Sequence, residues 1–112
     1  MRNMSFSITT SQMYSRLKTV TRRLGWDFLR PGDVVMAVEK AQGLKKGEHV
    51  KPIGKIKIVS IDCEPLSNIT IDDVQREGFA KMNVPEFVHM FCNANKCEPS
   101  TLINRIEFEV LY

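Results

Sequence analysis

The order of hydrophobic and polar positions along the chain predicts a series of short strands. β-Branched and aromatic residues alternate with polar ones in SFSITT, residues 5–10, which predicts an opening strand. A turn at PG, residues 31–32, leads into DVVMAVEK, residues 33–40, whose apolar run is typical of a buried strand. Alternation in IGKIKIVSID, residues 53–62, predicts a long strand, and LINRIEFEVLY, residues 102–112, predicts a closing one.

A first helix is predicted directly after the opening strand. Thr9 or Thr10 can cap it, and Met13, Tyr14 and Leu17 follow at helical spacing. The β-branched sequence TVT comes next and disfavours continuation. We therefore expect this helix to be short.

Two further helices begin at capping patterns in the second half of the chain. TIDD from Thr70 and NVPE from Asn83 each place an acidic residue three positions after the capping side chain. The first of these helices should end near Gly78, because glycine suits a helix C-terminal cap. The core-facing residues expected in the second are Phe87, Val88 and Phe91.

Polar chemistry is concentrated in KTVTRR, residues 18–23, just ahead of Gly25 and Trp26. We expect this segment to form a final helical turn or an irregular loop whose polar groups point at a ligand. Residues three apart share a face on a helical turn, so Lys18 and Thr21 would converge there, whereas on a flat strand they would point to opposite faces.

The order of these elements predicts the fold class. A strand, a helix, further strands, two helices and a closing strand suggest an α+β fold built on a small mixed or antiparallel β-barrel with flanking helices. AQGLKKGEHV, residues 41–50, predicts a hairpin loop or a mobile arm. A chain of 112 residues has room for one compact domain, residues 1–112.

Composition adds an expected location and an expected charge of the partner. No apolar run approaches the roughly 20 residues that cross a bilayer, and MRNMSFSITT lacks the apolar centre of a signal peptide, so we expect a cytoplasmic protein with no membrane partner. The three cysteines are then expected to be reduced. A net charge of +3 and a pI near 8.9 favour a polyanionic partner. We expect a monomer or a weak dimer.

Several motifs together resemble the ASCH domain of the PUA-like superfamily. They are Lys18, Thr21 and Arg23 in KTVTRR, then PGDVV, a lysine-bearing strand, REGF from Arg76 to Phe79, and the final IEFEVL. The resemblance spans nearly the whole chain and is greatest to the small, stand-alone ASCH proteins of bacteria and phages. It implies a PUA-like β-barrel with flanking helices and a cleft beside the lysine-threonine segment.

The resemblance also implies two kinds of function. Members of the family have been linked to RNA, which implies that RNA or a modified nucleoside or nucleotide binds in a basic cleft. One small branch hydrolyses the acetyl amide of acetylcytidine with a lysine, a threonine and a glutamate. By position these fall on Lys18, Thr21 and Glu77.

These residue types can perform amide hydrolysis. Threonine becomes a nucleophile when a base takes its proton, and lysine can be that base only if its pKa falls from about 10.4 through desolvation or neighbouring cations. Arg16, Arg22 and Arg23 are candidate neighbours. Glu77 could hydrogen-bond a cytosine amine or carry a proton to the leaving amine, while arginine or backbone donors hold the developing oxyanion.

A binding module needs a different set of residues. Phosphate contacts from basic side chains and one aromatic stacking platform would be enough to hold a nucleic acid. The candidates are Arg22, Arg23, Lys55 and Lys57 for phosphate and Trp26 or Tyr14 for stacking.

Each of these residues also has a purely structural interpretation. Lys18 and Arg23 could contact phosphate or solvent, Thr21 could satisfy the backbone, and Glu77 could pair with a surface cation. Trp26 could be a core residue. A third function, docking of a protein partner, rests on the lysine-rich arm from Gln42 to Lys51.

No metal or cofactor site is predicted. The spacing of His89, Cys92 and Cys97, with Cys63 or His49 as a fourth ligand, matches no standard zinc motif. The chain also lacks a glycine-rich phosphate loop, so we expect no nucleotide cofactor.

Overall fold

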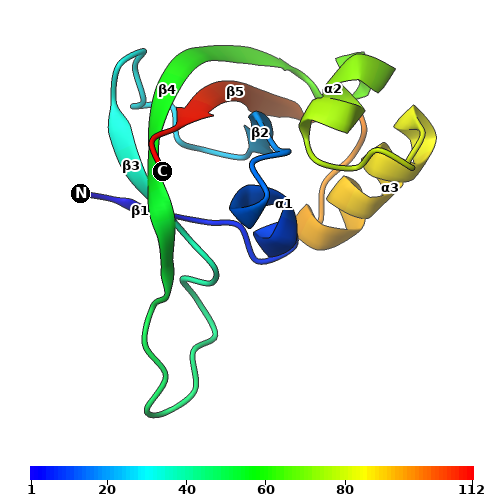
Figure 1. Ribbon diagram of the computed structural model, residues 1–112. Coiled ribbons are helices and arrows are strands. Elements are labelled where there is room, and N and C mark those ends of the chain that lie inside the picture. The colour runs from blue at the N-terminus through cyan, green and yellow to red at the C-terminus, as the bar shows by residue number, and fades with distance from the viewer.

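The computed structural model describes all residues, 1–112, as a mixed α+β fold (Figure 1). A five-stranded sheet carries one short helix beside its N-terminal strand and two helices beyond its long fourth strand. In chain order the elements are β1 (Asn3–Ser5), α1 (Thr10–Tyr14), β2 (Val20–Arg23), β3 (Val34–Val38), β4 (Pro52–Pro65), a 3-10 turn (Leu66–Asn68), α2 (Ile71–Arg76), α3 (Val84–Asn95) and β5 (Leu102–Val110).

The sheet has the strand order β1-β3-β4-β5-β2. β1 runs parallel to β3, and the other three pairs are antiparallel. β4 arches across the molecule in Figure 1 and breaks register against β5 between Ile58 and Ser60. β1 and β2 form the two edges, so the strand pairing leaves the expected barrel unconfirmed. Arg23 Nη2 nevertheless donates to the Ser5 carbonyl oxygen at 2.5 Å and links the two edges by a side chain.

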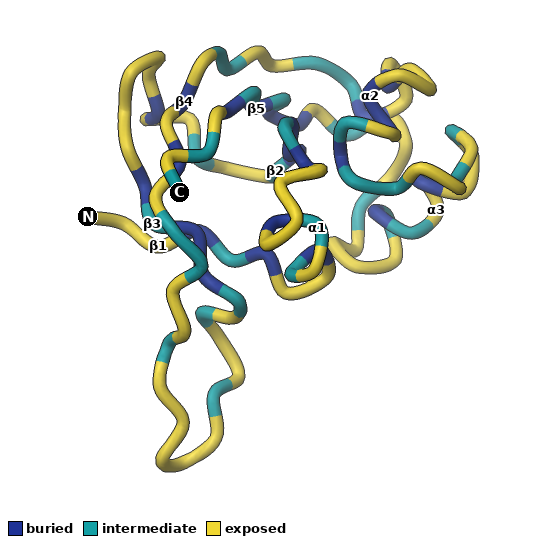
Figure 2. Tube along the Cα trace, viewed as in Figure 1, coloured by how far each residue is buried: buried dark blue, intermediate teal, exposed yellow.

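Two hydrophobic clusters hold the fold together, and their buried positions are dark blue in Figure 2. The larger lies between the sheet and α1, because alternate residues of each strand point inward. It consists of Met4, Phe6, Met13, Leu29, Val35, Ala37, Ile56, Ile58, Ile106 and Phe108. The smaller lies under α2 and α3 and consists of Leu66, Ile69, Val74, Phe87, Phe91 and Ile103.

Both predicted helix starts in the second half are confirmed. The Thr70 side chain accepts from the Asp73 backbone N–H at 3.2 Å at the start of α2. At α3 the capping box is complete: Asn83 accepts from the Glu86 N–H, and the Glu86 carboxylate accepts from the Asn83 N–H.

The predicted position of the opening strand is wrong. The alternation predicts residues 5–10, but β1 spans Asn3–Ser5 and the chain turns directly afterwards. Thr9 N–H bonds to the Phe6 carbonyl, and the Thr10 hydroxyl donates to the same oxygen at 2.8 Å. Local hydroxyl bonds to the backbone thus overrode the β-propensity of this segment. The first helix also ends earlier than expected, at Tyr14, and Leu17 is exposed.

The expectation of a helical turn at residues 18–23 is also wrong. Val20–Arg23 form β2, an edge strand paired in register with β5. Within residues 18–23, only Lys18 and Thr19 lie outside regular secondary structure. Pairing with β5 therefore decides the structure of this β-branched segment.

None of the helices has the length and apolar character needed to cross a bilayer.

Candidate functional site

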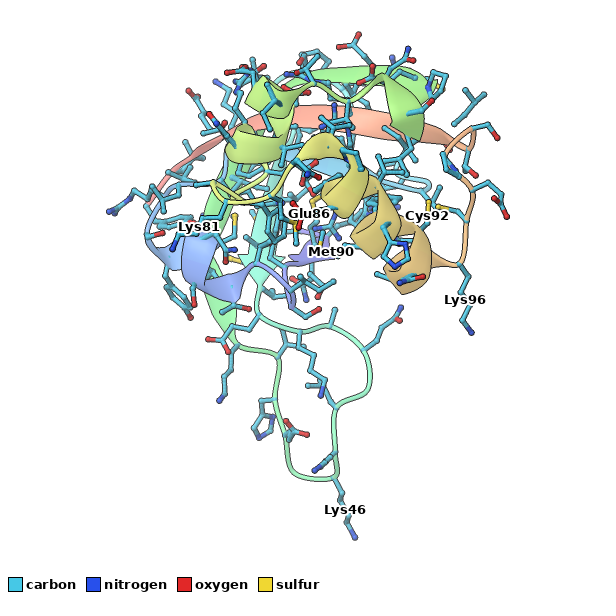
Figure 3. All side chains as sticks on the ribbon, turned by 90° about the vertical axis from the view of Figure 1, so that its right-hand side faces the viewer. Lys46, Lys81, Glu86, Met90, Cys92 and Lys96 are labelled. Atoms are coloured by element: carbon cyan, nitrogen blue, oxygen red, sulfur yellow. The ribbon has the colours of Figure 1, made fainter.

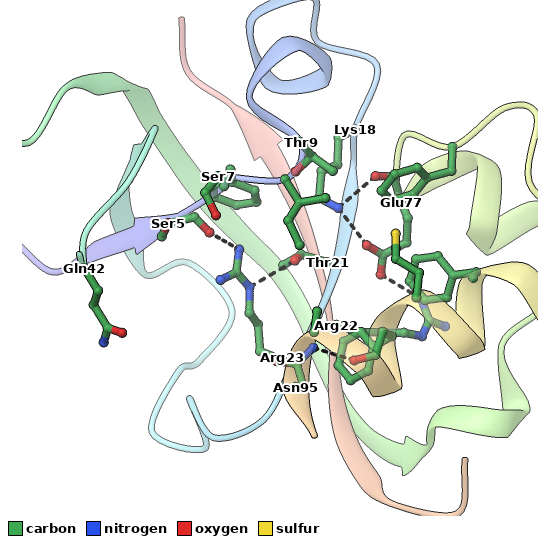
Figure 4. Close-up of a pocket in the computed structure, with 17 residues that line it drawn as sticks. Ser5, Ser7, Thr9, Lys18, Thr21, Arg22, Arg23, Gln42, Glu77 and Asn95 are labelled. Carbon is green, nitrogen blue, oxygen red and sulfur yellow. Dashed lines mark hydrogen bonds and ion pairs between the residues drawn. The ribbon is translucent and has the colours of Figure 1, made fainter. Parts of the chain in front are cut away.

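A cavity of about 410 Å³ opens beside the free edge of β2 (Figure 4). Its polar wall comes from the segment after β1, from β2 and its approach, and from the end of α2. Its apolar wall comes mainly from α3. The polar lining residues are Ser5, Ser7, Thr9, Lys18, Thr21, Arg22, Arg23, Gln42, Glu77 and Asn95.

Lys18 and Thr21 reach the same cavity without a helical turn. The Thr19 N–H bonds to the Arg76 carbonyl at 2.8 Å, which docks the approach to β2 onto the end of α2. Lys18 therefore lies in the irregular approach and is free of the up-down alternation that begins at Val20. Figure 4 shows the Lys18 and Thr21 side chains directed into the same space.

The REGF motif is a helix cap that presents Glu77. The Gly78 N–H bonds to the Gln75 carbonyl and the Phe79 N–H to the Val74 carbonyl, the two bonds of a Schellman motif. Gly78 has φ +102°, a conformation that side-chain-bearing residues adopt only with strain. Glu77, the C-cap residue, thereby turns both its carbonyl and its carboxylate toward β2.

Lys18 and Glu77 form the central contact of the site. Lys18 Nζ donates to Glu77 Oε1 at 2.7 Å and to the Glu77 carbonyl oxygen at 2.8 Å. Both side chains are only 4% exposed. Charges removed from water to this degree need close partners, and each residue supplies one for the other.

Arg22 links the Lys18–Glu77 pair to a second layer of charged side chains behind it. Its guanidinium contacts Glu77 Oε2 and Glu64 at 3.3 Å and Asp73 Oδ2 at 2.6 Å, and its side chain is 1% exposed. Arg105 approaches the same Asp73 carboxylate at 2.7 Å. Its hydrogen bonds, together with those of Arg22, lower the pKa of Asp73 to about 2 despite the opposing effect of burial. Arg22 Nε is buried with no hydrogen-bond partner.

Burial has the largest effect on the pKa of two of the cations that line the cavity, Lys18 and Arg23. It lowers the pKa of Lys18; Glu77 counteracts this, and the charges of Arg23 and Arg22 lower it further. Burial also lowers the pKa of Arg23 to about 10. Arg23 has no carboxylate within ion-pairing distance, whereas Lys18 and Arg22 both do. Its Nε and Nη2 donate to Thr21 and Ser5, which leaves Nη1 available to an electron-rich ligand.

Thr21 is held by this same guanidinium. Arg23 Nε donates to Thr21 Oγ1 at 3.1 Å, so the threonine oxygen accepts there and its own proton remains available to another acceptor. Thr21 is 3% exposed. The hydroxyl is thus fixed in the cavity wall with a cation beside its oxygen.

Aromatic and thioether groups form the opposite wall. Phe87 and Phe91 stack with ring centroids 6.2 Å apart, and Phe79 meets Phe87 edge-on. Lys18 Nζ lies 5.8 Å from the Phe79 ring centroid. Met90 completes this wall on α3. A flat, partly apolar ligand would find a matching surface here.

The fold brings together five of the eight predicted site residues. Lys18, Thr21, Arg22, Arg23 and Glu77 all line the cavity. The other three lie elsewhere and are Trp26, Lys55 and Lys57.

Trp26 and the two lysines occupy other surfaces for local reasons. Trp26 has φ +65°, packs partly against the larger core cluster and lies 5.4 Å from the Phe28 ring. Lys55 and Lys57 alternate with buried isoleucines on β4 and face solvent. Arg16 is also absent from the surroundings of Lys18, because its Nε donates to the Tyr112 carbonyl.

Several residues of the candidate site gave no recognisable signal in the sequence. The hydroxyls of Ser5, Ser7 and Thr9 reach the cavity only because β1 ends early. Asp73 could be predicted as a helix-capping acid, but its contact with Arg105 depends on the register of β5.

Cys92, on α3, and Cys97, just after it, do not gather a metal-ligand set. No group of three or more histidine, cysteine or acidic side chains is arranged to hold a metal ion. Cys92 and Cys97 have their Sγ atoms 4.0 Å apart, and His89 Nε2 contacts Asn93. These contacts follow from the geometry at the end of the helix.

Similarity to known proteins lies in the fold rather than the sequence. No protein-family model and no curated protein matches the chain. Among solved structures, the ASCH domain from Lactobacillus crispatus JV V101 superposes with a TM-score of 0.69 at 16% identity, over 99% of this chain and 80% of that one. The chain has an ASCH-type fold.

Other structures share this ASCH-type fold. The hypothetical protein PH0355 matches with a TM-score of 0.68 at 15% identity, over 97% of both chains. Protein EF3133 of Enterococcus faecalis V583, from DUF984, matches with a TM-score of 0.62 at 17% identity over 90% of this chain. This chain spans 65% of the length of that protein.

Proposed function

We propose that this ASCH-type protein binds a nucleoside-sized, electron-rich ligand in the cavity beside β2. The observation that carries the proposal is a half-buried guanidinium, Arg23, which has no carboxylate within ion-pairing distance and lines the cavity. A volume of about 410 Å³ lies within the range of about 300–1,000 Å³ that is typical of small-molecule sites.

The two walls together match the chemistry of a modified nucleoside. A base is flat and would stack against Phe79 or Phe87, while its carbonyl and ring nitrogens would accept from Arg23. The carboxylate of Glu77 retains acceptor capacity for an exocyclic amine, because each oxygen has two lone pairs and accepts one side-chain hydrogen bond. The ligand can be a free nucleoside or a nucleotide within RNA.

Titration calorimetry with cytidine and acetylcytidine tests the binding proposal. Arg23→Gln removes the unpaired guanidinium and should weaken affinity about tenfold or more. Arg30→Gln is the matched control, because Arg30 is exposed and outside the cavity. Equal affinities for the wild type and both variants, or no saturable binding by the wild type, would contradict the proposal.

A second function, hydrolysis of an acyl amide on the bound nucleoside, is favoured by the surroundings of Lys18. An uncharged lysine amine has two N–H groups and one lone pair, and the two bonds to Glu77 use both N–H groups. The lone pair would then be free to act as a base. Burial favours this uncharged form against the opposing effect of Glu77, and the charges of Arg23 and Arg22 favour it further.

The reaction would proceed by attack of Thr21 Oγ1 on the acyl carbon as Lys18 takes the hydroxyl proton. Arg23 would donate to the developing oxyanion. Lys18 would return the proton to the leaving nitrogen as the C–N bond breaks, and water would hydrolyse the resulting threonine ester to free the carboxylic acid. Glu77 would hold the amine in place.

Chromatographic assay of acetylcytidine deacetylation tests this second function. Thr21→Val keeps the shape of the side chain and should abolish turnover, while Thr21→Ser should retain part of it. Retained turnover in Thr21→Val would show that Thr21 is not the nucleophile. Lys55→Gln/Lys57→Gln should leave both turnover and nucleoside affinity unchanged, because neither residue lines the cavity.

A further inference from the structure

The longest loop of the protein projects away from the body. Residues 39–51 connect β3 to β4, and Figures 1 and 3 show this arm extending from the sheet in two perpendicular views, with Lys46 at its tip. A backbone bond from the Glu39 N–H to the Lys51 carbonyl closes its base, and one from Glu48 to Lys45 forms its tip.

The lysines of the arm have no ion-pair partners. None of the four has a carboxylate within 4.0 Å, although two glutamates lie in the same segment; they are Lys40, Lys45, Lys46 and Lys51. The glutamates are engaged elsewhere. Glu39 accepts from the Tyr14 hydroxyl at 2.7 Å, and Glu48 accepts from the Lys45 backbone N–H at 2.6 Å. Four lysines against two glutamates give the arm a net positive charge, and none of its ammonium groups is ion-paired.

The arm also borders the cavity. Gln42, near its base, is one of the lining residues and comes from a different part of the chain than the rest of the wall (Figure 4). A ligand that fills the cavity and continues beyond its mouth would thus pass beside the arm.

We propose that the arm binds the phosphates that flank a nucleotide held in the cavity, so that the ligand is single-stranded RNA rather than a free nucleoside. This inference rests on the proposed nucleoside site. Lysine ammonium groups on an exposed loop suit phosphates, whose binding is electrostatic and independent of sequence.

The composition of the arm favours phosphate over an acidic protein. A protein interface needs apolar or aromatic anchors at its centre. The arm offers only Ala41, Leu44 and Val50, all of them partly buried, and no aromatic residue. Its exposed side chains are those of the four lysines and of Gln42, Glu48 and His49.

Two ligands and two matched variants test the proposal. The ligands are free acetylcytidine and a short oligocytidylate, with and without one central acetylcytidine, each titrated at several salt concentrations. Lys45→Gln/Lys46→Gln removes two charges from the arm. Lys81→Gln/Lys96→Gln removes two exposed lysines outside both arm and cavity and is the control (Figure 3).

The arm variant should bind the oligonucleotides roughly tenfold more weakly at low salt. Its plot of log affinity against log salt should be shallower by about 1.4, since each lost contact to a single strand removes about 0.7. Its affinity for free acetylcytidine should match the wild type. Oligonucleotide affinities equal to those of the control variant would overturn the proposal.

The same titrations distinguish a failure of the arm proposal from a failure of the proposed nucleoside site. If the wild type binds no free acetylcytidine, the nucleoside site is wrong, and the arm is then judged on the unmodified oligocytidylate alone. If both variants lose oligonucleotide affinity equally, the attraction comes from net charge and the arm has no specific role.

Discussion

Lys18 Nζ lies 2.7 Å from Glu77 Oε1, although the two residues are 59 positions apart in the chain. Two local structures produce this contact: the irregular approach to β2 and the glycine-dependent cap at the end of α2. Because both groups are buried, the pair supports the fold as well as the candidate site. Stability and chemistry are therefore coupled at this point.

Removing one partner of this pair should be costly. Lys18→Met leaves the buried Glu77 carboxylate with only the longer contact to Arg22, and we expect the free energy of unfolding to fall by about 3–5 kcal/mol. Urea denaturation monitored by circular dichroism measures this. The double variant Lys18→Met/Glu77→Gln should lose less than the sum of the single changes, and strict additivity would show that the pair is not energetically coupled.

Acid should destabilise the protein through Asp73. The contacts with Arg105 and Arg22 lower the pKa of its carboxyl to about 2 in the folded state, against an ordinary value of 3.8. The resulting stabilisation is complete above the ordinary value and is lost as the pH falls toward about 2. Asp73→Asn should therefore be less stable near neutral pH and lose less stability on acidification than the wild type.

Asp72→Asn is the control for this acid sensitivity. Asp72 lies on the same helix, is exposed and forms no ion pair. Urea midpoints measured at about pH 6 and about pH 2.5 should separate the two variants, because most of the range between the ordinary pKa of 3.8 and the folded-state pKa of about 2 lies above the lower pH. An Asp73→Asn protein with wild-type acid sensitivity would assign the effect to other carboxyls.

The helix cap before the site should not tolerate a side chain. At φ +102° an alanine at Gly78 is strained by about 1–3 kcal/mol, and its Cβ would also lie 2.8 Å from Gln12 Cγ. Gly32→Ala is the control, since Gly32 has φ +94° and open space around it. Thermal unfolding should show a larger loss for Gly78→Ala, and adding Gln12→Ala should recover only part of the excess, because the Gln12 Cβ would also lie 2.9 Å from the new methyl group. Equal losses of stability in the two alanine variants would show that backbone strain alone, without the contact to Gln12, accounts for the effect.

Turnover should rise with pH. The uncharged form of Lys18 is the base in the proposed reaction, and burial lowers the pKa at which this form appears. The value of kcat/KM should therefore increase as pH rises through that lowered pKa, which is checked by a profile from about pH 6 to about pH 10. A profile that falls across this range would contradict lysine as the base.

Capping and periodicity predicted the second half of the fold well. Thr70 and Asn83 are caps because local side-chain chemistry decides helix starts, and local chemistry can be seen in one sequence. The position of β1 and the strand at Val20–Arg23 were missed. Both depend on pairing with strands distant in sequence, which periodicity cannot supply.

The candidate site was predicted in its residues but not in its geometry. Lys18, Thr21 and Glu77 do share a cavity, yet a strand with an irregular approach brings them there in place of a helical turn. The apolar wall and the second layer of charges could not be predicted, because they depend on how α3 and β5 pack against β2.

The most direct test of the account is an NMR titration of the labelled protein with acetylcytidine. Binding in the cavity predicts saturable shifts of backbone amides in residues 18–23 and 77–79 and on the inward face of α3, with little change at Lys55 and Lys57. Saturable shifts confined to other surfaces, or no shifts at high ligand concentration, would contradict a nucleoside site beside β2.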